Sequence, residues 1–265
     1  MKISLELLCH DVVELSREVG LFIKMEEHKV AQADIETKSK NSLVSYVDKT
    51  AEEKLVKDLA LFLPEAGFIA EEGTSNKVGD VYNWIIDPLD GTTNFLHGVP
   101  TYSVSVALKQ NDKIVLGVVY EVNRDECFYA WEGSNAFLNG DTIKVSSTPQ
   151  LADSLIATGF PYYDYKHLDN YFELLKELAK NTRGVRRIGS AAVDLVYMAC
   201  GRFDAFFEYS LHAWDVAAGA FIAQQAGAAI EDFKGGDNWL FGKEIVAVNP
   251  SLKNEFTQLL QAKLK

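Results

Sequence analysis

The chain has 265 residues, of which 48% are hydrophobic and 24% are charged, a composition typical of a globular protein and not of a disordered one. Its formal net charge of −12 argues against direct binding to nucleic acid, because contacts to the phosphate backbone need clustered Lys and Arg. Charged residues near the N-terminus argue against a signal peptide, and no apolar run reaches the ~18 residues of a membrane span. The three cysteines are far apart in the sequence and predict neither disulfides nor a zinc site. We therefore expect a cytoplasmic protein.

The N-terminal quarter is predicted to hold two helices with a loop between them. From Leu5 to Phe22, apolar side chains recur at spacings of three and four residues, which is the pattern of one helix face. Residues 31–42 have no apolar period and are interpreted as an exposed loop. A second helix is expected to begin after Asp48 and to end at Pro64.

Short apolar segments between residues 67 and 131 predict a sheet. The connections between the later segments are short enough for hairpins, so these strands should be antiparallel. The expected strands are residues 67–70, 81–87, 102–108, 114–120 and 127–131.

After about residue 146 the pattern changes to alternating strands and helices, which predicts α/β layering. The expected order is a strand at 154–160, helices near 167–180 and at 190–200, a strand at 203–209, a helix from Asp215, strands at 228–233 and 244–248, and a C-terminal helix with Pro250 in its first turn. We find no internal repeat or Pro/Ser-rich linker. We therefore predict two halves, residues 1–145 with two long helices and the antiparallel sheet, and residues 146–265 with the α/β layers, sharing an extensive interface.

The stretch W-I-I-D-P-L-D-G-T-T-N-F places Asp87 and Asp90 three residues apart at the end of a predicted strand. Taken alone, the pair indicates a turn, because Asp-Pro and Asp-Gly are turn sequences. Further acids stand at the ends of other core elements: Glu71 and its neighbour Glu72 follow a strand, and Asp215 stands where a helix begins. Each has a simpler role alone, as a strand end or a helix N-cap, but together they predict a cation site.

Four motifs carry a resemblance to a known family. They are E-E-G at Glu71, D-P-L-D-G-T-T-N-F at Asp87, G-S-A-A at Gly189 and W-D-V-A-A-G at Trp214. In order and approximate spacing they resemble the signatures of the inositol monophosphatase family of Mg²⁺-dependent, lithium-sensitive phosphomonoesterases. The resemblance implies the layered αβαβα sandwich of the inositol monophosphatases and sugar phosphatases, and a homodimer.

The resemblance also implies roles for individual residues. The implied metal ligands for two or three Mg²⁺ ions are Glu71, Asp87, Asp90, Asp215 and the main-chain carbonyl of Leu89. The implied catalytic residues are Thr92, Asp48 and Glu71, with Thr92 and Asp48 orienting the nucleophilic water. Most of these residues fall in residues 1–145, whereas Asp215 and the substrate pocket fall in residues 146–265.

Substrate binding is implied for eight positions: Asp90, Gly91, Thr92, Gly189, Ser190, Ala191, Glu208 and Asp215. Gly91 and Thr92 match the phosphate-binding turn, and Glu208 matches an acid that binds substrate hydroxyls. The simpler roles are a tight helix start for Ser190 and a strand end for Glu208. Lys38 is a candidate for a lysine on a mobile loop near a weakly held metal; Lys40 competes with it, and a solvated loop charge is the default for both.

The chemical hypothesis is hydrolysis of a phosphate monoester of a small cyclitol or sugar, with inositol monophosphate as the first candidate. The alternatives within the superfamily are fructose 1,6-bisphosphate, histidinol phosphate and adenosine 3′,5′-bisphosphate, and residues 161–167 are expected to shape the pocket that chooses among them. A different class of function is a regulatory binding protein that keeps the fold, since some bacterial relatives associate with the transcription machinery. The complete set of acids argues against a purely non-catalytic descendant.

Overall fold

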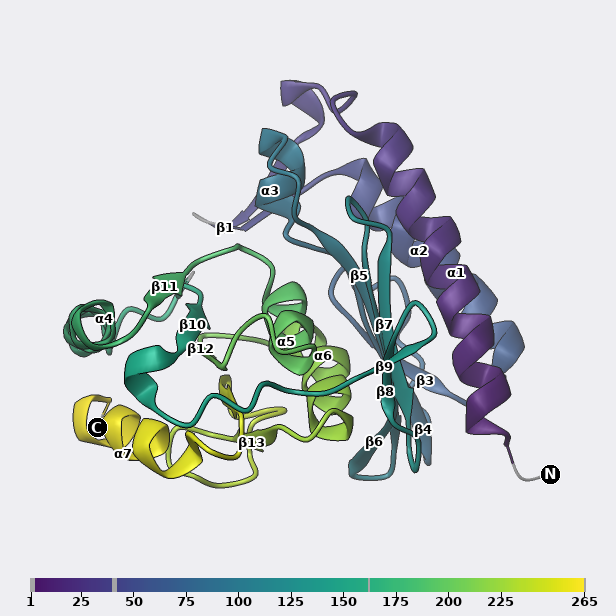
Figure 1. The fold of residues 1–265 in the computed structure, drawn as a ribbon. Coiled ribbons are helices and arrows are strands. Elements are labelled where there is room, and N and C mark those ends of the chain that lie inside the picture. The colour runs from purple at the N-terminus through teal and green to yellow at the C-terminus, as the bar shows by residue number, and fades with distance from the viewer. Residues whose placement is uncertain (1–2, 40–41, 162, 265) are drawn as a thin grey trace.

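The computed structural model describes residues 3–39, 42–161 and 163–264 and has the predicted layered αβαβα architecture. Figure 1 shows the five layers in succession, with α1 and α2 on one outer face and α4 and α7 on the other. Two sheets lie between these outer layers, and α5 and α6 separate the sheets. The helices are α1 (Leu5–Glu26), α2 (Tyr46–Phe62), α3 (Thr92–His97), α4 (Leu168–Asn181), α5 (Ala191–Ala199), α6 (Ala213–Gln225) and α7 (Lys253–Lys263).

The larger sheet has the strand order β3-β4-β5-β6-β7-β8-β9 over the described residues. Only its β3–β4 pair is parallel among the described strands; the remaining pairs are antiparallel, in agreement with the hairpin connections of the sequence. The strands are β3 (Gly67–Ala70), β4 (Tyr82–Asp90), β5 (Ser103–Gln110), β6 (Lys113–Glu121), β7 (Glu126–Trp131), β8 (Ala136–Leu138) and β9 (Asp141–Ile143).

The smaller sheet is mixed and has the order β11-β10-β12-β14-β13. Strands β11 and β12 both pair parallel with β10, so the carboxyl ends of all three strands lie at the same edge. The strands are β10 (Leu155–Thr158), β11 (Gly184–Arg186), β12 (Ala205–Tyr209), β13 (Ala229–Glu231) and β14 (Glu244–Val248).

Apolar side chains fill the spaces between successive layers. One cluster joins α1 and α2 to the larger sheet, and it includes the fully buried Leu55 and Trp84. A second cluster encloses α5 and α6 between the two sheets, and a third joins the smaller sheet to α4 and α7 around Phe207 and Phe256. Because α5 and α6 are covered on both sides, their sequences are apolar almost all round.

Some local predictions were wrong. Residues 31–42 were expected to form a loop, but they include a short 3-10 helix (Gln32–Asp34), strand β1 (Glu36–Ser39) and the start of β2 (Ser42–Val44), and β1 and β2 pair antiparallel. Strand β1 has only polar residues and is ordered by backbone pairing with β2, so it leaves no apolar period to read. Lys38 lies in β1, and Lys40 lies outside the described residues, so the mobile-loop role of either lysine stays a prediction.

Other errors concern helix starts. Helix α6 begins at Ala213, two residues before the predicted start at Asp215. Helix α2 begins before Asp48, because Ser45 is its N-cap and Asp48 completes a capping box by accepting the Ser45 backbone N–H at 2.8 Å. Pro250 stands in the turn before α7 and not in its first turn.

The predicted division between residues 145 and 146 stays a prediction. The larger sheet ends at Ile143 and the smaller sheet begins at Leu155, but α6 packs directly on β5 and β6. The two sheets therefore share a helix layer. Within the part of the chain that the structure describes, no helix has the length and apolar character that a membrane span requires.

Candidate active site

A β-bulge in β4 brings Asp87 and Asp90 to the same face of the sheet. In a regular strand, residues three apart point to opposite faces. Here Asp87 is opposite Ser105 and Asp90 is opposite Ser103, so three steps along β4 match two steps along β5. The extra residue restores a common orientation for the two carboxylates. The expected turn at residues 87–91 is thus a bulged strand that continues through Asp90.

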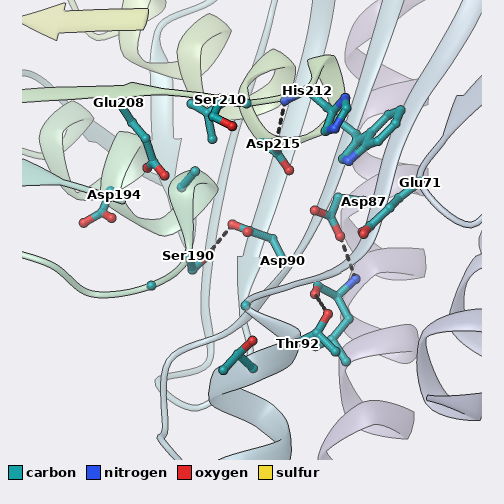
Figure 2. Close-up of a pocket in the computed structure, with 18 of the residues that line it drawn as sticks. Glu71, Asp87, Asp90, Thr92, Ser190, Asp194, Glu208, Ser210, His212 and Asp215 are labelled. Atoms are coloured by element: carbon teal, nitrogen blue, oxygen red, sulfur yellow. Dashed lines mark hydrogen bonds between the residues drawn. The ribbon is translucent and has the colours of Figure 1, made fainter. Parts of the chain in front are cut away.

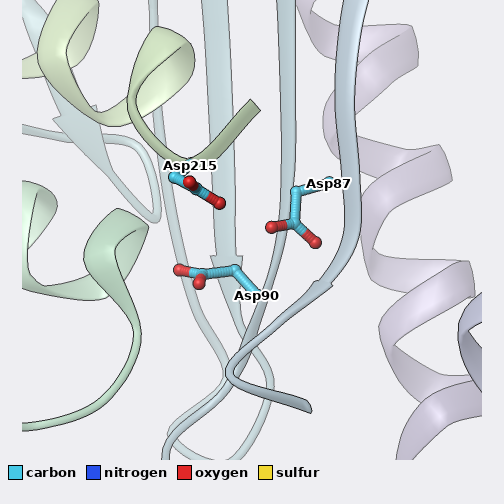
Figure 3. Close-up of side chains that lie close together, drawn as sticks. All are labelled: Asp87, Asp90 and Asp215. Carbon is cyan, nitrogen blue, oxygen red and sulfur yellow. The ribbon is translucent and has the colours of Figure 1, made fainter. Parts of the chain in front are cut away.

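Asp215 approaches the same point from the smaller half of the chain. It lies in the first turn of α6, where its Oδ2 accepts the backbone N–H of His212 at 2.6 Å. One oxygen from each of Asp87, Asp90 and Asp215 lies within 4.8 Å of the other two. Figure 3 shows the three side chains converging from the bulged strand and from α6. This spacing fits the shared coordination of a hard cation.

Glu71 lines the same pocket directly after β3, where its backbone N–H donates to the carbonyl of Ile86 at 3.2 Å. The turn that follows is fixed from α2, because the buried Glu52 carboxylate accepts the backbone N–H groups of Glu72 and Thr74 at 2.7 and 2.8 Å. Glu71 is therefore held between a sheet and a fixed turn.

Electrostatics make the acid cluster unfavourable without a cation. Burial and then the Glu71 carboxylate raise the pKa of Asp87 well above its usual range, and burial and then Asp90 do the same for Asp215. Burial raises the pKa of Asp90 to about 6, although a hydrogen bond from Ser190 opposes this shift. A bound divalent cation would reverse these shifts, because it would become the largest local charge. The donor set of carboxylate oxygens fits Mg²⁺.

Thr92 and Asp48 form a hydrogen-bonded pair beside the cluster. The Thr92 hydroxyl lies 2.9 Å from Asp48 Oδ1 and 3.0 Å from the carbonyl of Leu89, and both oxygens are acceptors. The other oxygen of Asp48 accepts the backbone N–H and the hydroxyl of Ser45, each at 2.8 Å. Asp48 therefore completes the start of α2 and also accepts the hydrogen bond of the Thr92 hydroxyl.

The N-terminus of α5 holds Asp90 in place. Its Oδ2 accepts the Ser190 hydroxyl at 2.6 Å and the backbone N–H of Ala192 at 2.8 Å. Ser190 is also the N-cap of α5, since its hydroxyl accepts the backbone N–H of Val193 at 3.3 Å. The simpler prediction of a helix start is thus confirmed for Ser190, and its side chain contacts a predicted metal ligand directly.

The far side of the pocket is built from the smaller sheet. Glu208 lies in β12, is 5% exposed, and is placed next to Gly159, which follows β10. Figure 2 shows Glu208 and Asp194 on one side of Asp90, with Asp87 and Glu71 on the other. Every predicted metal and substrate residue from Glu71 to Asp215 lines this one pocket.

Residues 161–167 were expected to shape the pocket, and Tyr163 of this segment lines it, with its hydroxyl 2.7 Å from Nε2 of His212. Sequence reasoning missed Asp194, which lines the pocket from the first turn of the buried α5. A signal for Asp194 was present, because a single acid in the apolar run A-A-V-D-L-V-Y-M-A is unusual in a buried helix.

Comparison with known proteins places these motifs in one family. The profile of the inositol monophosphatase family matches residues 6–265. The chain belongs to the inositol monophosphatase family. It is 35% identical over 258 residues to an inositol-1-monophosphatase of Mesorhizobium japonicum, covering 97% of each chain. It is 40% identical over 239 residues to the Nus factor SuhB of Pseudomonas aeruginosa, covering 88% of each.

A solved structure agrees with the family assignment. An IMPase from Thermotoga maritima superposes with a TM-score of 0.87 at 33% identity, covering 96% of each chain. The inositol monophosphatase family consists of metal-dependent phosphatases that act on phosphorylated small molecules, and the carboxylate cluster described above provides hard ligands for such a metal.

Metal binding should stabilise this member of the inositol monophosphatase family measurably. In EDTA the raised carboxyl pKa values, about 6 for Asp90, mean that the folded state binds more protons than the unfolded chain above ~pH 4. Stability should therefore fall as pH rises through about 6, and Mg²⁺ should restore it by neutralising the charges. A ligand at about 100 times its Kd adds about 2.7 kcal/mol, which corresponds to several degrees in Tm.

The measurement is thermal unfolding at pH 5.5 and 7.5, in EDTA and in Mg²⁺. The Mg²⁺-induced rise in Tm should be larger at pH 7.5. A rise that is equal at both pH values, or absent, would contradict a cation site at these carboxylates.

Proposed function

We propose that this protein hydrolyses a phosphate monoester by a Mg²⁺-dependent direct attack of water, and that inositol monophosphate is its substrate. The observation that carries the proposal is the convergence of Asp87, Asp90 and Asp215 within 4.8 Å beside the hydrogen-bonded pair of Thr92 and Asp48. Uncatalysed hydrolysis of phosphate monoesters is among the slowest reactions known, so the site must supply both a nucleophile and strong charge neutralisation.

The ligands for two or three Mg²⁺ ions would be Glu71, Asp87, Asp90, Asp215 and the carbonyl of Leu89, which all belong to residues that line the pocket. When bound, Mg²⁺ supplies a nucleophilic water at neutral pH and neutralises charge on the phosphoryl oxygens. The bulge and the hydrogen bonds to Asp90 and Asp215 hold the ligand oxygens in place before any cation arrives.

The chain's own residues would orient the reacting groups. Asp48 accepts the hydroxyl hydrogen of Thr92, so the lone pairs of Thr92 Oγ1 remain available to accept a hydrogen bond from the attacking water. The backbone N–H groups of Gly91 and Thr92 would bind phosphoryl oxygens. Gly91 has φ 95°, and an added Cβ would lie 3.1 Å from the carbonyl of Thr101, so the turn needs glycine.

The alcohol portion of the substrate would lie against Gly189, Ser190, Ala191 and Glu208. Gly159 makes room for this arrangement, because a Cβ at that position would lie 2.0 Å from Oε1 of Glu208. We expect Gly159→Ala to displace Glu208 and to lower kcat/KM for inositol 1-phosphate at least ten-fold relative to kcat/KM for p-nitrophenyl phosphate, whose alcohol has no further hydroxyl. An unchanged ratio of the two would argue against a substrate role for Glu208.

A second function is favoured by the names of the relatives, since the one from Pseudomonas aeruginosa is a Nus factor. An association with the transcription machinery would use the surface and leave the pocket available, so the two functions are compatible. The homodimer, cytoplasmic location and lithium sensitivity that the family resemblance implies belong to the same proposal.

The test is a panel of esters assayed with and without Mg²⁺: inositol 1-phosphate, fructose 1,6-bisphosphate, histidinol phosphate and adenosine 3′,5′-bisphosphate. The proposal expects the highest kcat/KM for inositol 1-phosphate. A higher kcat/KM for another ester would support the proposed reaction but contradict inositol monophosphate as the substrate. No turnover of any ester by folded protein, together with recovery of polymerase-associated factors in a pull-down, would favour the regulatory function.

A further inference from the structure

Asp194 is a buried acid with an oxygen that lacks a partner. Its side chain is 1% exposed, and its Oδ1 has no hydrogen-bond partner among the described residues. A polar atom left unpaired in the interior is disfavoured, and the large majority of buried side-chain polar atoms find a partner. An orphaned oxygen of this kind therefore calls for a specific explanation.

Asp194 lies at the end of the pocket where the alcohol portion of the substrate is expected. The residue lines the same pocket as the acid cluster, but on the side occupied by Glu208. Burial, and next the Glu208 carboxyl group, raise the pKa of Asp194 well above its usual range, while Arg187 opposes the shift. The two acids are thus electrostatic neighbours at the end of the pocket where the alcohol portion of the substrate would lie.

A structural role in α5 does not account for these features. Acids in the first turns of helices stabilise the N-terminus, but they do so with small energies and normally in contact with water. The N-terminus of α5 already has its cap and its anion, because Ser190 caps the helix and Asp90 accepts the backbone N–H of Ala192. Asp194 donates only its backbone N–H to the carbonyl of Ser190, as any helical residue would.

We propose that Asp194 is a substrate-specificity residue, whose unpartnered Oδ1 forms a hydrogen bond with a hydroxyl group of the substrate alcohol next to the one bound by Glu208. The chemical class that fits is a polyhydroxylated alcohol carrying one phosphate. A carboxyl group bonds a hydroxyl in either protonation state, since the carboxylate accepts and the acid both donates and accepts. The inference rests on the proposed function, because it assigns a contact within the same pocket.

The test compares three variants with the wild type. Asp194→Leu removes the hydrogen-bonding group and keeps the branched shape of the side chain, and Asp194→Asn keeps a hydrogen-bonding group. Met198→Leu alters a buried side chain one turn further along α5 and is the matched control. The measured quantity is the ratio of kcat/KM for inositol 1-phosphate to kcat/KM for p-nitrophenyl phosphate, in Mg²⁺. Thermal unfolding of each variant accompanies the kinetics.

We expect Asp194→Leu to lower this ratio about ten- to hundred-fold, which corresponds to the loss of one hydrogen bond. The change should appear as a higher KM for inositol 1-phosphate. Asp194→Asn should recover part of the ratio, and Met198→Leu should leave it unchanged. The Tm of Asp194→Leu should equal or exceed that of the wild type, because the orphaned oxygen is removed. A residue of merely structural importance would lower Tm and reduce turnover of both esters equally, and that result would overturn the proposal.

Failure of the proposed function can be told apart from failure of this inference. If the wild type hydrolyses neither ester, the proposed function is wrong, and calorimetric titration with inositol 1-phosphate in Mg²⁺ then makes the same comparison between wild type and Asp194→Leu. Weaker binding to the variant supports the specificity role. Equal binding, or no binding to the wild type, overturns it.

Discussion

Replacing Asp90 with asparagine is expected to reduce Mg²⁺-dependent phosphate release about a hundred- to a thousand-fold. Removal of one preorganised stabilising group at an active site commonly lowers kcat by 10²–10³, and Asp90 lies where the cation ligands and the N-terminus of α5 meet. The loss should appear in kcat and in the Mg²⁺ concentration needed for half-maximal rate. The measurement is a Mg²⁺ titration of phosphate release.

The fold should survive this substitution. The asparagine oxygen can accept the hydrogen bonds that Asp90 Oδ2 now accepts from Ser190 and Ala192. Removing one of several mutually repelling charges should keep Tm in EDTA equal to that of the wild type or raise it. The matched control is Asp112→Asn, because that side chain is fully exposed at 106% and lies outside the pocket. Activity of Asp90→Asn within a few-fold of this control would contradict the metal-ligand role.

Replacing Thr92 with valine is expected to lower kcat about 10²- to 10⁴-fold with little change in KM, which is the range for loss of a positioned proton-transfer group. Valine keeps the shape of the side chain but leaves Asp48 Oδ1 without the hydroxyl that it now accepts at 2.9 Å. Thr92→Ser should restore most of kcat, because it restores the hydroxyl. The measurement is steady-state kinetics in saturating Mg²⁺.

Thr50→Val provides the control for this prediction. Thr50 lies in α2, its side chain is exposed and it lies outside the pocket, so the same chemical change there tests only the tolerance of a helix. Equal kinetics for Thr92→Val and Thr50→Val, or an effect of Thr92→Val confined to KM, would argue against a role for Thr92 in orienting water.

The residues of the candidate site could be predicted from the sequence where an acidic residue stands within a recognisable local motif. Asp87 and Asp90 stand out in the sequence, but the reason they face the same way is a bulge set by pairing with Ser105 and Ser103, which are distant in the chain. The use of the Ser190 hydroxyl by Asp90 likewise depends on a contact between residues 100 apart. Tertiary contacts of this kind leave no local pattern.

The fold could be predicted where burial is one-sided. Helix α1 has one buried face and therefore a clear apolar period, whereas β1 has only polar residues and β2 has two apolar ones, too few to show a period. The role of Asp194 could not be predicted, because α5 is apolar and buried on both sides, so its sequence does not indicate which face lines a pocket. The residues that sequence reasoning missed are those whose partner is a ligand or a distant element.

The most direct test of the account is phosphate release from inositol 1-phosphate by the wild-type protein, measured across a Mg²⁺ titration and in EDTA. The carboxylate cluster predicts turnover that is absent in EDTA, rises with Mg²⁺ and saturates. Turnover that proceeds equally in EDTA would contradict a metal-dependent reaction at Asp87, Asp90 and Asp215, and so would folded protein that binds Mg²⁺ but releases no phosphate from any ester of the panel.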